Sequence, residues 1–86
     1  MAQPTIIIYT ASYCPYCVNA KRLLTAKGLV YEEIDVTHDT ELRAKLVEKA
    51  EGRRTVPQIF INDQPIGGFD DLSAKHQSGE LDLLLA

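Results

Sequence analysis

The chain has little of several features that would assign it to a broad functional class. Its 86 residues carry 9 basic and 12 acidic side chains, which gives a formal charge of −3 at pH 7. Because nucleic acids are bound by basic surfaces, this balance argues against a nucleic-acid partner. No segment approaches the ~20 apolar residues that span a bilayer. We therefore expect neither nucleic acid nor a membrane among its partners.

Cysteine is scarce as well. The two cysteines are too few for the disulfide framework of a small secreted domain. Residues 1–4 lack the basic region of a signal peptide, and Ile6–Ile8 is too short for its apolar region. These absences predict a cytoplasmic protein. The hydrophobic content of 45% is that of a folded chain, and no repeat or low-complexity segment is present. The length predicts a single domain over residues 1–86.

Both cysteines lie in one short motif, Cys14-Pro15-Tyr16-Cys17, between an apolar run and a helical pattern. If Cys14 is the N-cap, Pro15 takes the first helical position, where its missing N–H costs nothing. The unpaired N–H groups and the positive end of the helix dipole there favour a thiolate. Cys17 follows one turn later on the same face, roughly 5–6 Å away, which a disulfide can span. The motif predicts a redox centre with an exposed, acidified Cys14 and a partner that attacks it.

A metal site is the main alternative for such a pair. Structural zinc needs four ligands, and only His38 and His76 remain, at unsuitable spacings. We therefore expect no metal, and no chemical role for either histidine.

The first half of the chain predicts a strand, a helix and a second strand. The β-branched run Thr5–Tyr9 does not alternate, which is typical of a strand buried on both faces. Apolar residues then recur at helical spacing from Pro15 to about Lys27, where Gly28 can end the helix. Leu29–Val36 follows as a second strand. Such a unit implies parallel pairing with a right-handed crossover.

The second half predicts a further helix, a hairpin and a closing helix. Asp39 or Thr40 can cap a helix that runs to about Ala50. Strands are expected at Gln58–Ile61 and Gln64–Ile66, then a helix from about Leu72 to Ser78 and a last helical turn within residues 81–85. Together these elements predict an α/β fold, in which helices cover a small mixed sheet.

At this point the sequence resembles the glutaredoxins, the glutathione-dependent branch of the thioredoxin-like fold, and most of all their short bacterial type. The resemblance rests on four stretches in order, Cys14–Cys17, Thr55–Pro57, Gln58–Ile61 and Gly67–Leu72. It implies a four-stranded mixed sheet flanked by helices in the order βαβαββα. It also implies a cis Pro57 that faces the cysteines and turns the Val56 backbone outward to pair with an extended peptide such as glutathione.

The resemblance further implies which residues bind glutathione. Arg54, or its neighbour Arg53, would hold the glycyl carboxylate. Free N–H groups near Phe69 and Asp70 would hold the γ-glutamyl carboxylate, and Asp71 would take the ammonium. Tyr16 would flank the ligand. The alternative is that Tyr13 and Tyr16 simply cover the disulfide. The full implied set is Tyr16, Arg54, Thr55, Val56, Pro57, Gly68, Phe69, Asp70 and Asp71.

Two positions depart from the family pattern. Ala11 stands where relatives usually carry a lysine that helps to stabilise the thiolate and to bind a glutathione carboxylate. This difference predicts weaker glutathione binding here. Phe69 stands where relatives often have a further cysteine, so any disulfide beyond Cys14–Cys17 must be intermolecular.

The resemblance implies an enzyme, a glutathione-dependent disulfide oxidoreductase that acts through Cys14 and Cys17. Glutathione would be its co-substrate, with no tightly bound cofactor, and its partners would be disulfide-containing or glutathionylated proteins. We expect a monomer. An iron–sulfur cluster carrier, in which two chains and two glutathiones hold the cluster, is the alternative, and a redoxin reduced by thioredoxin reductase is a third possibility. Pro15 argues against the cluster carrier, and the Gly67–Asp71 loop argues for glutathione as the reductant.

Overall fold

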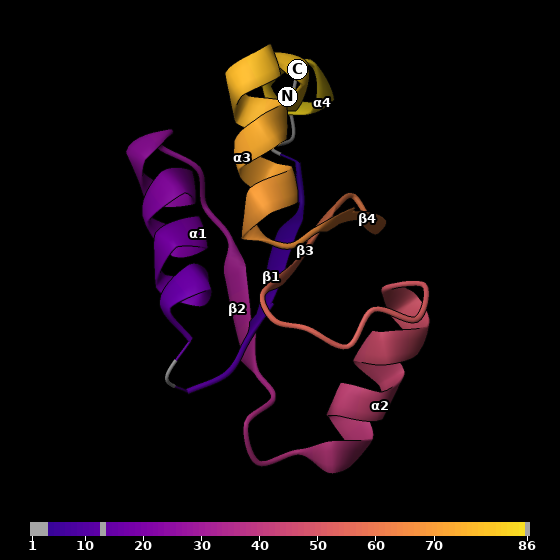
Figure 1. Ribbon diagram of the computed structural model, residues 1–86. Helices are drawn as coiled ribbons and strands as arrows, with labels where there is room; N and C mark the ends of the chain where they lie inside the picture. The colour runs from indigo at the N-terminus through magenta and orange to yellow at the C-terminus, as the bar shows by residue number, and fades with distance from the viewer. Residues whose placement is uncertain (1–3, 13, 86) are drawn as a thin grey trace.

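Four strands form a mixed sheet in the order β2-β1-β3-β4 (Figure 1). This computed structural model describes residues 4–12 and 14–85. Met1–Gln3, Tyr13 and Ala86 lie outside the described residues. The expectation of no signal peptide rests partly on Met1–Gln3 and therefore also lies outside them. Strand β1 (Ile6–Thr10) pairs in parallel with β2 (Glu32–Asp35) and antiparallel with β3 (Gln58–Ile61). Strand β3 also pairs antiparallel with β4 (Gln64–Gly67). The predicted four-stranded mixed sheet is confirmed.

Helices cover both faces of the sheet. Helix α1 (Pro15–Ala26), α3 (Phe69–Ser78) and α4 (Glu80–Leu85) pack on one face, and α2 (Thr40–Lys49) packs on the other (Figure 1). The buried core of the first face consists of Ile6, Ile8, Ala20, Leu24, Ile59, Ile61, Leu72 and Leu81. The buried core of the second face consists of Tyr9, Val36, Leu46, Ala50 and Phe60.

Strand β1 contributes to both cores because successive side chains of a strand point to opposite faces. Ile6 and Ile8 belong to the first core and Tyr9 to the second. The prediction of a strand buried on both faces is therefore confirmed, with bounds one residue later than expected. Since β1 is central, the chain leaves the middle of the sheet at Thr10 and reaches α1 within a few residues. This connection places the cysteine motif above the carboxyl end of β1.

Two predicted boundaries were wrong. The second strand begins at Glu32 rather than Leu29, because Leu29 closes the C-terminus of α1 and packs against the first core. Gly28 has a φ of 73°, and the Leu29 N–H donates to the Leu24 carbonyl at 3.0 Å. Helix α3 begins at Phe69 rather than Leu72, because Gly68 is its N-cap and the Asp71 carboxylate accepts the Gly68 N–H at 3.0 Å.

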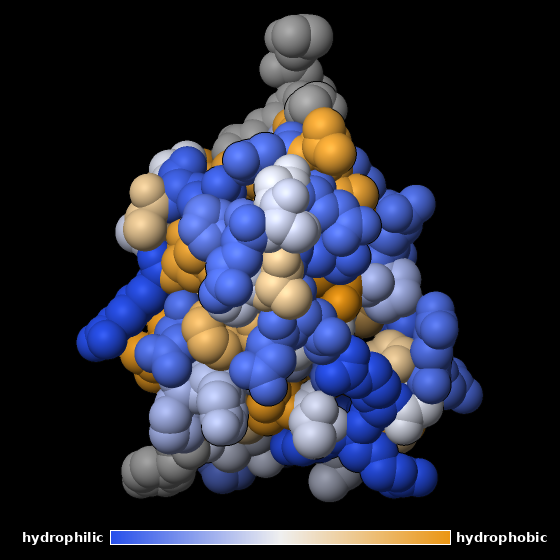
Figure 2. Space-filling view, turned by 45° about the horizontal axis from the view of Figure 1, so that its top comes forward, coloured by the Kyte–Doolittle hydropathy of each residue, from blue (hydrophilic) through white to orange (hydrophobic). Residues whose placement is uncertain are grey.

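The predicted last helical turn is the six-residue helix α4, whose Leu81 is fully buried in the first core. The element order is therefore βαβαββαα, one short helix more than the order that the family resemblance implied. Among residues 4–12 and 14–85, no helix has both the length and the apolar character needed to cross a bilayer. Figure 2 shows a mainly hydrophilic face on which hydrophobic residues form small, separate patches.

Candidate active site

Cys14 and Cys17 form a disulfide at the start of α1, with their Cα atoms 5.2 Å apart. Cys14 is the N-cap, in extended conformation, and its Sγ accepts the Cys17 N–H at 3.1 Å. Pro15 takes the first helical position, as predicted. Cys14 is partly exposed, whereas Cys17 is only 2% exposed. The predicted spacing is therefore confirmed, since the two cysteines lie one turn apart and are joined by a disulfide.

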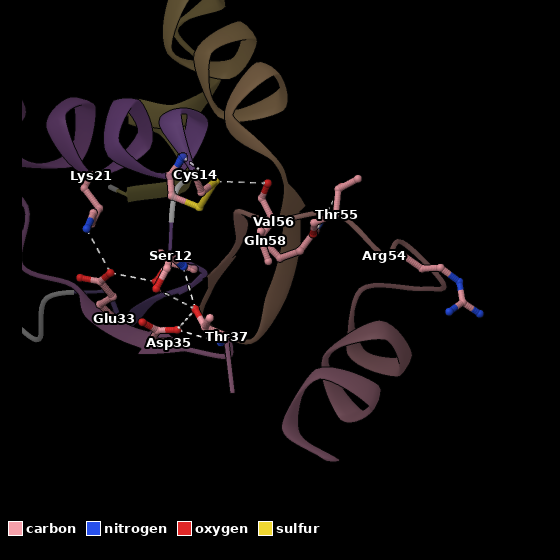
Figure 3. The surroundings of a disulfide bond; sticks show 12 residues. Ser12, Cys14, Lys21, Glu33, Asp35, Thr37, Arg54, Thr55, Val56 and Gln58 are labelled. Atoms are coloured by element: carbon pink, nitrogen blue, oxygen red, sulfur yellow. Dashed lines mark hydrogen bonds and ion pairs between the residues drawn. A yellow bond between two sulfur atoms is a disulfide. The ribbon is translucent and has the colours of Figure 1, made fainter. Parts of the chain in front are cut away.

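The loop before β3 brings a second backbone segment to the disulfide. The Val56–Pro57 peptide bond is cis, as the resemblance implied. The Val56 carbonyl oxygen lies 3.7 Å from Cys14 Sγ (Figure 3). Gln58, which is buried at the start of β3, donates from Nε2 to the Thr55 carbonyl at 2.8 Å and so anchors this loop. Residues 42 positions apart in the sequence thus meet at one sulfur atom.

A cavity of about 220 Å³ opens beside Val56. All of the residues predicted to bind glutathione line it except Arg54. Arg54 is exposed, and its side chain points away from the disulfide in Figure 3. Its neighbour Arg53 lines the cavity instead. The cavity lining consists of Tyr16, Arg53, Thr55, Val56, Pro57, Gly68, Phe69, Asp70 and Asp71.

One ion pair dominates the charge distribution of this cavity. Arg53 Nη1 lies 2.9 Å from Asp71 Oδ2, and the same oxygen accepts the Gly68 N–H. The hydrogen bond from Gly68, and then Arg53, lower the pKa of the Asp71 carboxyl below its usual value. Gly67 has a φ of 114°, and a Cβ there would collide with the Arg53 guanidinium and the Asp71 carboxylate. The absence of a side chain at Gly67 therefore leaves the space that the Arg53–Asp71 ion pair occupies.

Two aromatic rings stand at the rim of the same cavity. Tyr16 is 58% exposed, and its ring centroid lies 6.4 Å from that of Phe69. An aromatic ring that remains this exposed offers apolar surface to a ligand. Tyr13, the other tyrosine of the motif, lies outside the described residues.

The glutaredoxin family model matches residues 6–66 of this chain. The chain belongs to the glutaredoxin family. It is 49% identical over 83 residues to a glutaredoxin of Pseudomonas aeruginosa, which covers 96% of this chain and 98% of that protein. The family thus accounts for the cysteine motif and for the fold around it, and it assigns the chain to the thiol–disulfide oxidoreductases.

Solved glutaredoxin structures resemble this one closely. The solution structure of glutaredoxin from Brucella melitensis matches with a TM-score of 0.86 at 48% identity, over 99% of this chain and 91% of that one. The crystal structure of a buckwheat glutaredoxin–glutathione complex also matches with a TM-score of 0.86, at 32% identity, over 95% of this chain and 76% of that one. The predicted thioredoxin-like fold is confirmed.

A second cavity, of about 550 Å³, lies on the other side of the disulfide and was not predicted. Cys14, Cys17 and Ala11 line it together with three charged residues, Lys21, Glu33 and Asp35. Figure 3 shows this charged cluster on one side of Cys14, with Val56 on the other. The available signal was the position of Lys21, four residues after Cys17 on the same helical face.

Hydrogen bonds order the charged wall of the second cavity. Glu33 Oε2 accepts from the buried Thr10 hydroxyl at 2.8 Å and from Lys21 Nζ at 3.1 Å. The hydroxyl and the backbone N–H of Thr37 both donate to Asp35 and lower the pKa of its carboxyl. Within residues 4–12 and 14–85, no group of three or more His, Cys, Asp or Glu side chains is placed to hold a metal ion.

Proposed function

We propose that this chain is a glutathione-dependent thiol–disulfide oxidoreductase that reduces protein disulfides and glutathione mixed disulfides through Cys14 and Cys17. Glutathione is the co-substrate, and no cofactor is tightly bound. The observation that carries the proposal is the position of Cys14 Sγ. It caps α1, accepts the Cys17 N–H and lies 3.7 Å from the Val56 carbonyl at the edge of the first cavity.

The position of Cys14 explains why it is the nucleophile. The first N–H groups of a helix have no partner within the helix and, with the helix dipole, favour negative charge on the capping atom. The Cys17 N–H already points at Cys14 Sγ in the oxidised form. After reduction the same donor would stabilise a thiolate, which is the reactive form of cysteine. Cys17 is buried and therefore reacts second.

One cysteine suffices for a glutathionylated protein. The Cys14 thiolate attacks the glutathione sulfur of the mixed disulfide, a Cys14–glutathione disulfide forms, and the protein thiolate leaves with the electron pair. A second glutathione thiolate then attacks the bound glutathione sulfur. Oxidised glutathione forms, and the Cys14 thiolate is released. The rate depends on the thiolate fraction, on the pKa of the leaving thiol and on access to the sulfur.

A protein disulfide requires both cysteines. The Cys14 thiolate attacks one substrate sulfur and releases the other as a thiolate. The Cys17 thiolate then attacks Cys14 Sγ, the Cys14–Cys17 disulfide forms, and the second substrate sulfur leaves reduced. Two glutathiones subsequently restore the two thiols and leave as oxidised glutathione. Electrons therefore pass from glutathione through the cysteine pair to the substrate.

The first cavity has the chemistry to hold glutathione. The backbone of Val56, which precedes the cis Pro57, can pair with the extended tripeptide. The N–H groups at the start of α3, near Gly68, Phe69 and Asp70, suit its γ-glutamyl carboxylate. Arg53 suits the glycyl carboxylate, and Asp71 the ammonium. Tyr16 and Phe69 supply apolar surface, and Thr55 lies beside Val56.

Two serine variants test the assignment with a glutathionylated peptide as substrate and glutathione as reductant. Cys14→Ser is expected to lose all activity, whereas Cys17→Ser is expected to keep deglutathionylation and to lose the reduction of protein disulfides. Serine is a good N-cap, so Cys14→Ser should not disturb the start of α1. Full deglutathionylation by Cys14→Ser would refute the proposal. Equal rates when thioredoxin reductase replaces glutathione and glutathione reductase would refute the glutathione dependence.

We also propose that the protein is a cytoplasmic monomer that folds as one domain. Size-exclusion chromatography tests the monomer and also tests the rival function of an iron–sulfur carrier. A colourless monomer from cells grown with iron supports the enzyme, whereas a brown dimer with visible absorbance supports the carrier. Fractionation of the cells of origin tests the location.

A further inference from the structure

The second thiol lies in surroundings that oppose its ionisation. Cys17 is 2% exposed, and it lies on the side of α1 that faces the sheet, as do Ala20 and Leu24. Apolar burial disfavours a thiolate. However, in the two-cysteine route Cys17 must lose its proton before it can attack Cys14. A positive charge on the accessible side of Cys17 would lower the cost of this ionisation.

The second cavity gives Cys17 charged neighbours. Lys21 lines this cavity from α1, and Glu33 and Asp35 line it from β2. The charged side chains of the first cavity are Arg53, Asp70 and Asp71, and Cys17 does not line that cavity. Asp35 is held by Thr37 through two hydrogen bonds.

Lys21 is the one cation of this set, and its position is fixed from two sides. It follows Cys17 by four residues, so the two lie on neighbouring turns of one helical face. Its Nζ lies 3.1 Å from Glu33 Oε2, and Glu33 in turn accepts the hydroxyl of Thr10, which is only 2% exposed. Glu33 therefore orients the ammonium toward the cavity and also partly offsets its charge.

We propose that Lys21, oriented by Glu33, favours the thiolate of Cys17 and so sets the rate at which the second cysteine closes the disulfide. Lys21 and Glu33 are positioning residues that act on the ionisation of Cys17. The inference rests on the order of attack in the proposed function, with Cys14 first and Cys17 second. It assigns this network to the two-cysteine route and leaves the one-cysteine route unaffected.

The step balances without a further reactant. The Cys17 thiol gives its proton to water in the cavity, and its thiolate attacks Cys14 Sγ. The Cys14–Cys17 bond forms while the bond between Cys14 Sγ and the substrate sulfur breaks. The leaving sulfur takes the electron pair as a thiolate. Lys21 exchanges no proton in this step and contributes only its charge.

Single-turnover reaction of the reduced protein with the aromatic disulfide dithionitrobenzoate isolates this step. Cys14 attacks first and releases one coloured thionitrobenzoate. Cys17 then attacks the mixed disulfide and releases a second one. Since Cys14 carries no charge in the mixed disulfide, the pH dependence of the second phase reports the ionisation of Cys17. The assay contains no glutathione.

Two variants break the same ion pair and are expected to act in opposite directions. In Lys21→Met the anionic Glu33 remains, so the midpoint of the second phase should move about 0.5–1 pH unit upward. In Glu33→Gln the cation remains and Thr10 keeps an acceptor, so the midpoint should move downward. Because nucleophilicity falls as thiol pKa falls, a one-unit rise should slow the second phase only about threefold at pH 7. Lys21→Arg should restore the original midpoint.

Matched controls come from the next residues along the chain. Arg22→Met removes a cation that does not line the second cavity, and Glu32→Gln removes an anion one residue before Glu33. Both should leave the second phase unchanged, and every variant should leave the first phase within about twofold of the original rate. A purely structural ion pair would give Lys21→Met and Glu33→Gln the same direction of change. That result, or unchanged midpoints in both, overturns the inference.

The failure of this inference can be distinguished from the failure of the proposed function. If the midpoints shift as expected but deglutathionylation proves independent of glutathione, the proposed function fails and the role of Lys21 stands. If Cys17→Ser protein shows normal deglutathionylation and the midpoints do not move, the proposed function stands and the role of Lys21 fails.

Discussion

Arg53 and Arg54 offer a test of the first cavity in which one residue serves as the control for its neighbour. Arg53 lines the cavity and pairs with Asp71, whereas Arg54 lies outside it. A hydrogen bond between charged groups is worth ~1.5–3 kcal/mol. The Arg53 side chain is 48% exposed and already paired with Asp71. Solvent screening and this existing partner therefore reduce the free energy that Arg53 contributes to ligand binding. We expect ~1–1.5 kcal/mol, which corresponds to a roughly five- to tenfold change in affinity.

The assay is steady-state deglutathionylation of a peptide by Arg53→Gln and Arg54→Gln. Arg53→Gln should raise KM for the glutathionylated peptide roughly five- to tenfold, with kcat nearly unchanged, because the contact is made in both ground and transition states. Arg54→Gln should stay within about twofold of the original KM. Similar thermal unfolding of both variants excludes a folding defect. The reasoning would be refuted by equal effects at the two positions, or by a larger effect at Arg54.

Three further predictions concern the surroundings of the site. Ala11→Lys should lower KM for a glutathionylated peptide, since the family resemblance places a carboxylate-binding lysine at this position; an unchanged KM contradicts this. Asp71→Asn should cost ~1 kcal/mol of unfolding free energy at pH 7, because the Gly68 N–H loses a charged acceptor. The pKa of Asp71 is lowered in the folded state, so this contribution is present above its unfolded value of 3.8 and is lost as pH falls through the folded pKa. Urea titrations of the two proteins should therefore converge in acid, and a difference that persists there would contradict the assignment. Gly67→Ala should lower the free energy of unfolding by more than ~1 kcal/mol, since the backbone there has a positive φ and the added Cβ would collide with Arg53 and Asp71. An unchanged free energy of unfolding in the same urea titration would contradict this prediction.

How much of the fold the sequence could predict depended on how local the determining contact is. Strand β3 was predicted with its bounds at Gln58–Ile61, because an apolar run between turn signals defines it. The start of α1 was predicted from Cys14 and Pro15 alone. By contrast, the start of β2 depended on whether Leu29 closes the helix or opens the strand. That choice is decided by packing against the first core.

The predictions for the site also succeeded or failed according to how local the determining contact is. Spacing along one helix predicted an accessible Cys14 and a partner, Cys17, one turn later on the same face; the burial of Cys17 was not predicted. The cis Val56–Pro57 bond followed only from the family resemblance, since its role depends on a contact across 42 residues. Whether Arg53 or Arg54 faces the cavity is decided by the direction of the chain as it leaves α2, and two adjacent arginines carry no signal for that. The second cavity was missed because Lys21 and Glu33 meet only through the parallel pairing of β2 with β1.

The position of Cys14 as a helix cap separates the fold from the chemistry. An oxygen in place of its sulfur would accept the same Cys17 N–H, and serine ranks among the preferred residues at this position. The fold therefore does not depend on whether the residue at position 14 can react. A chain that loses its nucleophile in this way would still fold and still present both cavities, so natural selection can retain the sulfur only through the reaction that it performs.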